Sequence, residues 1–187
     1  MNRLRQVVLI VSTVCFSWLA MMVAHEVGHV LHAWWSGGTI SKVVLHPLVI
    51  SQTDLSHNPH PYFVAWGGPI WGCLIPLILL ALARLARVGF AFLFRFFAGF
   101  CLIANGVYIG AGSFVGAGDA GDLMRLGSPQ WLLILFGIAT CPFGMCLWHG
   151  LGPSFGMGSP RQQVDRRAAV VVPVALTLLV ALELWLS

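Results

Sequence analysis

Two histidines and a glutamate lie within five residues of one another in the run HEVGH, at His25, Glu26 and His29. Residues four apart share one face of an α-helix, so the two imidazoles lie about 5 to 6 Å apart at Cβ, a spacing that suits chelation of one Zn²⁺. Glu26 projects about 100° round the helix from His25. It can therefore hold a water molecule without being a ligand, which is the HExxH arrangement of zinc-dependent peptide hydrolysis.

The HEVGH run is a specific signal for a chain of this composition. With seven histidines and two glutamates in 187 residues, chance placement gives an HExxH string in roughly three of a thousand shuffled sequences. The alternative interpretation is a hydrogen-bonded polar cluster that only joins neighbouring helices. Ionisable side chains within an apolar membrane helix are expensive to bury and are by default functional, so we favour a metal site.

A catalytic zinc site also needs a third protein ligand and an open position for water. The candidates are His32, His46, His57, His60, His149, Asp119 and Asp122. His32 lies on the same helix as His25 and His29, and one straight helix can hardly place three ligands around a single ion. For the other histidines, a solvated or structural role is the ordinary one. The glycines near the two aspartates let the backbone approach a metal closely. The residues alone barely separate Asp119 from Asp122, and a helix N-cap is the alternative role for Asp119.

Two further features have both a packing and a functional interpretation. The run GGPIWG at residues 67–72 places small residues at Gly68 and Gly72, a spacing that permits close packing of membrane helices. Asn105 can donate to a developing oxyanion, although a hydrogen bond between helices is the more ordinary role.

The elements that position these residues follow from composition. The chain is 58% hydrophobic and 9% charged, with a mean hydropathy of +0.87, whereas soluble domains carry roughly 25% charged residues. This excludes a soluble globule, a disordered tail and a disulfide scaffold. Although the net charge is +4, the basic residues lie in gaps between apolar stretches, so no nucleic-acid partner is expected. The five cysteines fall within apolar stretches and should be free thiols.

Five apolar stretches are long enough to span a bilayer: 7–34, 62–85, 89–109, 131–151 and 168–186. We therefore predict an all-α polytopic membrane protein, one domain over residues 1–187, with the first helix retained rather than cleaved as a signal peptide. β-Branched residues between 37 and 60 predict a short hairpin. The Gly-rich stretch 110–130 predicts a re-entrant segment or loop, covered by protein or a water cavity.

The distribution of basic residues predicts the topology. Arg3, Arg5, Arg84, Arg87 and the run from Arg161 to Arg167 mark the cytoplasmic side, and Lys42 and Arg125 the other side. This gives an N-in, C-out chain with HEVGH towards the extracytoplasmic face. Arg95 lies inside the third span, where we expect it to extend towards the cytoplasmic face.

Together, these motifs resemble the site-2 protease family of intramembrane zinc metalloproteases, in particular its small, compact bacterial-type members. The shared features are HEVGH in an apolar helix, the segment GGTISKVVLHPL, Gly68 with Pro69 opening the next span, and GDAGDL; they cover residues 24–127. No proline lies between Asn105 and Asp119, so the Asn-x-x-Pro run common before the family's aspartate is missing.

The resemblance implies site roles and an activity. His25 and His29 would be zinc ligands and Glu26 the catalytic base. Asp119, followed by a small residue and an apolar pair one turn later, fits the family's third ligand better than Asp122. We expect a zinc-dependent intramembrane endopeptidase, as in regulated intramembrane proteolysis, in the plasma (inner) membrane of a bacterium.

The expected substrate is a transmembrane or membrane-edge segment of another membrane protein. An edge strand between residues 37 and 50 would hold that segment extended by strand addition. The alternative is a non-catalytic metal-binding protein or a transporter using the same His/Asp cluster, although nearly uncharged second, fourth and fifth spans disfavour transport. An inactive protease relative retained for partner binding is a third possibility.

Overall fold

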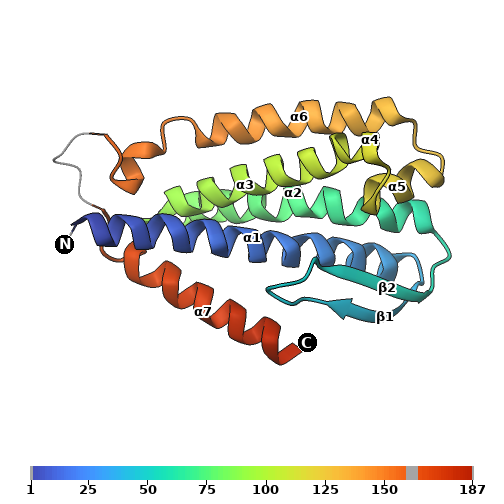
Figure 1. The fold of residues 1–187 in the computed structure, drawn as a ribbon, viewed down its shortest axis with the longest axis horizontal. Coiled ribbons are helices and arrows are strands. Elements are labelled where there is room, and N and C mark those ends of the chain that lie inside the picture. The colour runs from blue at the N-terminus through green and yellow to red at the C-terminus, as the bar shows by residue number, and fades with distance from the viewer. Residues whose placement is uncertain (1, 159–163, 187) are drawn as a thin grey trace.

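The computed structural model describes residues 2–158 and 164–186. Figure 1 shows a bundle of long helices with a two-stranded sheet beside one end. In chain order the elements are α1 (Asn2–Trp35), β1 (Thr39–Val44), β2 (Gln52–His57), α2 (Pro61–Leu85), α3 (Ala91–Gly110), α4 (Gly112–Val115), α5 (Gly118–Arg125), α6 (Gln130–Trp148), the 3₁₀ helix η1 (Gly152–Phe155) and α7 (Ala168–Leu186).

Within the described residues, five helices are long and apolar enough to cross a membrane, which confirms the predicted all-α polytopic fold. The third span runs further than predicted, from Ala91 to Val115, because α4 continues the direction of α3. The fourth ends at Trp148. The chain is therefore a multi-pass membrane protein.

The helices pack as neighbours in a fixed order. α1 packs on α2 and α7, and α3 packs between α2 and α6. A buried cluster of Ile109, Ala120, Leu123 and Leu133 fastens the short helix α5 to α3 and α6. Burial of these apolar side chains fixes α5, and with it Asp119, against the bundle.

The predicted hairpin is present as an antiparallel pair of strands, β1 and β2. Figure 1 shows it alongside the C-terminal half of α1. The turn of the hairpin, residues 47–50, lines a small hollow together with Trp18 of α1. Trp18 precedes His25 by seven residues, which is about 10 Å along the helix axis. The hairpin thus runs back along α1 past the HEVGH run.

The Gly-rich segment is more helical than predicted. Its glycines interrupt helices rather than prevent them, because Gly116 ends α4 with φ +69° and Gly118 begins α5 with φ +55°, values that favour glycine. The N-cap of α5 is Ala117, and no side chain caps the helix. The interpretation of Asp119 as a helix N-cap is therefore wrong.

The charged ends of the bundle follow the predicted pattern. Figure 1 places the start of α1, the α2–α3 turn and the start of α7 at one end, and the hairpin and α5 at the other. Arg95 donates to the backbone oxygen of His149, at 2.6 Å, near the first of these ends. Arg161 lies outside the described residues, and all five cysteines are free thiols. Which membrane face each end meets remains a prediction.

Candidate metal centre

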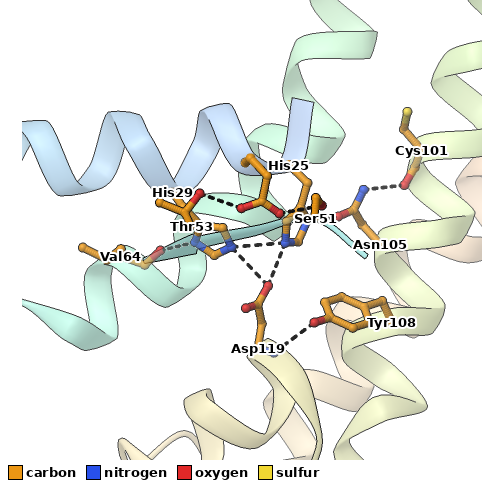
Figure 2. Close-up of polar contacts among 10 residues, drawn as sticks. His25, His29, Ser51, Thr53, Val64, Cys101, Asn105, Tyr108 and Asp119 are labelled. Carbon is orange, nitrogen blue, oxygen red and sulfur yellow. Dashed lines mark hydrogen bonds and ion pairs between the residues drawn. The ribbon is translucent and has the colours of Figure 1, made fainter. Parts of the chain in front are cut away.

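The side chains of His25 and His29 from α1 and Asp119 from α5 converge on one point (Figure 2). The two Nε2 atoms lie 3.1 Å apart, and Asp119 Oδ2 lies 2.7 Å from His25 Nε2 and 3.2 Å from His29 Nε2. Ligand atoms at tetrahedral zinc are about 3.3 Å apart, given bonds of about 2.0 to 2.1 Å. The triangle therefore has nearly the size that a metal ion requires.

Hydrogen bonds behind the rings select the tautomer that a metal needs. His29 Nδ1–H donates to the backbone oxygen of Val64 at 2.9 Å, and His25 Nδ1–H donates to Asn105 Oδ1 at 2.8 Å. The amide of Asn105 is oriented in turn by donating to the backbone oxygen of Cys101. With the hydrogens on Nδ1, both neutral rings direct the Nε2 lone pair at the Asp119 carboxylate. Three acceptors facing one another call for a cation between them.

The glycines of GGPIWG make space for this centre. A Cβ added to Gly68 would lie 2.3 Å from His29 Nε2 and 2.5 Å from His25 Nε2, and one added to Gly72 would lie 2.7 Å from Asn105 Oδ1. Gly67 instead meets the backbone of Gly28 in α1. The close helix packing expected at Gly68 and Gly72 is found instead at Gly67, whereas the missing side chains of Gly68 and Gly72 leave room for the site.

Asp119 is electrostatically suited to be a ligand. Burial would raise the pKa of Asp119. When the two rings are protonated instead of holding a metal, however, their hydrogen bonds to Asp119 and their positive charge outweigh burial and hold that pKa well below its usual range. The carboxylate is therefore ionised at neutral pH, as metal binding requires. Its backbone N–H donates to Tyr108 Oη at 3.1 Å, which fixes the start of α5 against α3.

Glu26 is buried but stands apart from the triangle. Its Oε1 accepts a hydrogen bond from Ser51 Oγ at 2.7 Å, and its Oε2 accepts one from Thr53 Oγ1 at 2.6 Å. Both donors belong to the hairpin segment. Glu26 is not among the residues whose ligand atoms converge, as expected for a glutamate that acts on water rather than on the metal.

A cavity of about 1070 Å³ opens onto the centre. It lies between α1, the hairpin, α2, α3 and α5, and His25, Glu26, His29 and Asp119 all line it. A volume of this size lies at the upper end of small-molecule pockets, and is large enough for several residues of a peptide.

The structure separates the other candidate ligands from the centre. His32 donates to the backbone oxygen of Phe63 and stacks on its ring, and His46 Nδ1 accepts from the backbone N–H of Leu48. Asp122 pairs with Arg125 on the exposed side of α5. In the part of the chain that the structure describes, the one group that can hold a metal ion is His25, His29 and Asp119.

Sequence reasoning missed four residues that support the site: Val64, Tyr108, Ser51 and Thr53. Tyr108 follows Asn105 by three positions and so shares its helix face. This spacing could have identified Tyr108 from the sequence as a neighbour of the site. Val64 contributes only a backbone oxygen, which no side-chain pattern reveals.

Comparison with known proteins finds no matching family model, no matching curated protein and no matching solved structure. The resemblance to site-2 proteases therefore rests on the motif residues alone.

Proposed function

We propose that this protein is a zinc-dependent intramembrane endopeptidase. The observation that carries the proposal is the convergence of His25, His29 and Asp119 beside Glu26 on a membrane-length helix, with the Nδ1 atom of each imidazole facing a hydrogen-bond acceptor. Two imidazoles and one carboxylate leave a fourth position open, which is the ligand pattern of catalytic rather than structural zinc.

The donor set favours zinc over the common alternatives. Two nitrogens and one carboxylate oxygen are poor ligands for Mg²⁺ and Ca²⁺, which prefer oxygen, and contain no thiolate of the kind that Cu(I) selects. When zinc is bound, it supplies Lewis acidity that activates water near neutral pH and polarises a scissile carbonyl.

The chain's own residues supply the remaining chemistry. Glu26 takes the proton of the attacking water as the new C–O bond forms, and then passes that proton to the amine nitrogen as the C–N bond breaks. Asn105 and the carbonyl of Val64 keep the two imidazoles in the ligating tautomer throughout. Because Asn105 Oδ1 orients His25 and the amide nitrogen already donates to the backbone oxygen of Cys101, we assign Asn105 a positioning role rather than that of an oxyanion donor.

The position of the cavity favours a membrane-protein substrate. His25 lies ten residues before Trp35, about 15 Å along the helix, so the centre is inside the apolar span of α1. The cavity wall includes β2 rather than the edge strand expected between residues 37 and 50. The extended backbone of β2 suits a substrate segment drawn out as an additional strand. We therefore propose a transmembrane or membrane-edge segment as substrate. The motif resemblance to small bacterial-type site-2 proteases is what supports placing the protein in the plasma (inner) membrane of a bacterium.

A chelation experiment tests the proposal. Purified protein in detergent or lipid should contain about one zinc per chain, lose cleavage of a model transmembrane substrate when zinc is stripped, and regain it when zinc is added back. Tight zinc binding with no hydrolysis of any of a panel of transmembrane substrates would instead favour a non-catalytic metal-binding protein.

A further inference from the structure

The hairpin contacts Glu26 through two hydroxyl groups that no motif marks. Ser51 Oγ and Thr53 Oγ1 each donate to a different oxygen of the same carboxylate, at 2.7 and 2.6 Å. Glu26 is only 3% exposed, so little water competes for these oxygens. Charge-assisted hydrogen bonds of this length are among the stronger ones in proteins.

The spacing of the two donors follows from strand geometry. Residues two apart in an extended strand point to the same face, so Ser51 and Thr53 present both hydroxyls to α1. Thr53 pairs with Val43 of β1, which fixes its backbone in the sheet. In the view of Figure 2, Thr53 lies on the left and Ser51 on the right of the cluster, and Asp119 lies below both.

From these contacts we propose that Ser51 and Thr53 are positioning residues for Glu26, so that the hairpin holds the catalytic base in its working rotamer. This rests on the proposed function, because it assigns Glu26 the role of base. A carboxylate has about four acceptor positions. Two are used by the hydroxyls, and the others stay available to a water molecule.

The hairpin also lines the cavity through residues 50–55. A substrate segment lying against β2 therefore touches the element that orients the base. When the hairpin is held in place, the same element contacts the substrate and fixes the position of the Glu26 carboxylate. When the hairpin is loose, the Glu26 carboxylate is free to turn away.

The kinetic test compares the double variant Ser51→Ala/Thr53→Val with wild type, on a model transmembrane substrate. The expected result is a fall in kcat of about 10- to 100-fold, the cost of misplacing a catalytic group by about 1 Å, with KM and zinc content within twofold. Thr53→Ser, which keeps the hydroxyl, should retain wild-type kcat. The matched control is Ser41→Ala/Ser56→Ala, whose hydroxyls bond only to hairpin carbonyls; it should also retain kcat.

Two outcomes would overturn the positioning role: an unchanged or increased kcat in the double variant, or an equal fall in the Ser41→Ala/Ser56→Ala control. Either would leave the proposed function standing, provided that wild type cleaves.

A readout independent of activity is hydrogen exchange of residues 51–55 in zinc-loaded Glu26→Ala, with α6 as internal reference. Exchange there should rise by about tenfold or more once the carboxylate is lost; equal exchange in Glu26→Ala and wild type would sink the inference even if no substrate were found.

Discussion

The substitution Gly68→Ala probes the metal centre without removing any ligand. The added Cβ would lie 2.3 Å from His29 Nε2 and 2.5 Å from His25 Nε2, whereas ordinary contacts of carbon begin at about 3.5 Å. Each imidazole would have to retreat by about 1 Å. Metal–ligand distances tolerate only about 0.2 Å, so the two rings cannot accommodate the methyl group and still share an ion.

The expected loss can be bounded from below. Removing a hydrogen-bond partner behind a ligand typically costs 10- to 100-fold in metal affinity, and displacing two ligands at once is a larger disturbance. We expect Gly68→Ala to weaken zinc binding by at least about 100-fold, or about 2.8 kcal/mol at 1.4 kcal/mol per tenfold. Alanine is favoured over glycine in a helix, so helix propensity does not cause the loss.

Competition with a chromophoric zinc chelator measures the affinity, and far-UV circular dichroism checks that the helices form. Gly72→Ala, whose Cβ would press on the side chain of Asn105 instead, should give a smaller loss because that amide can turn. Gly89→Ala, where nothing lies within 4 Å, should bind zinc as wild type does. A folded Gly68→Ala protein with wild-type zinc affinity would refute the geometry of the site.

Two further predictions concern the groups around the ligands. Asn105→Leu should lower zinc affinity by about 10- to 100-fold, because His25 Nδ1 loses its hydrogen-bond acceptor. Competition with a zinc chelator measures this affinity, and an unchanged value would mean that the hydrogen bond does not support the ligand. Asp119→Asn should lose bound zinc while Asp122→Asn keeps it, since Asp122 pairs with Arg125; metal analysis showing the reverse would overturn the choice of third ligand.

The helical fold could be predicted from sequence because its signal is local. Length and hydropathy alone identify five spans, and β-branched residues after the first identify the hairpin. Helical periodicity likewise pairs His25 with His29. The short helices α4 and α5 were harder to predict, since their glycines are poor helix formers and α5 depends on burial of Ala120 and Leu123 against α3 and α6.

The remaining parts of the site depend on contacts between distant segments. Ser51 and Thr53 meet Glu26 across 25 and 27 residues of chain, and Gly68 faces histidines of another helix. A serine, a threonine or a glycine carries no signal of its own for such a role. Asp119 was separable from Asp122 only by family resemblance at the sequence level, whereas the orientation of α5 separates them in space.

Cleavage by wild type and by Glu26→Gln, both loaded with zinc, tests the central claim most directly. Glutamine keeps the shape of the side chain but cannot take a proton from water. The account predicts equal zinc content and, because general-base catalysis contributes roughly 10²- to 10⁴-fold, a fall in cleavage of a transmembrane substrate of at least about 100-fold. Cleavage by Glu26→Gln at the wild-type rate would contradict it.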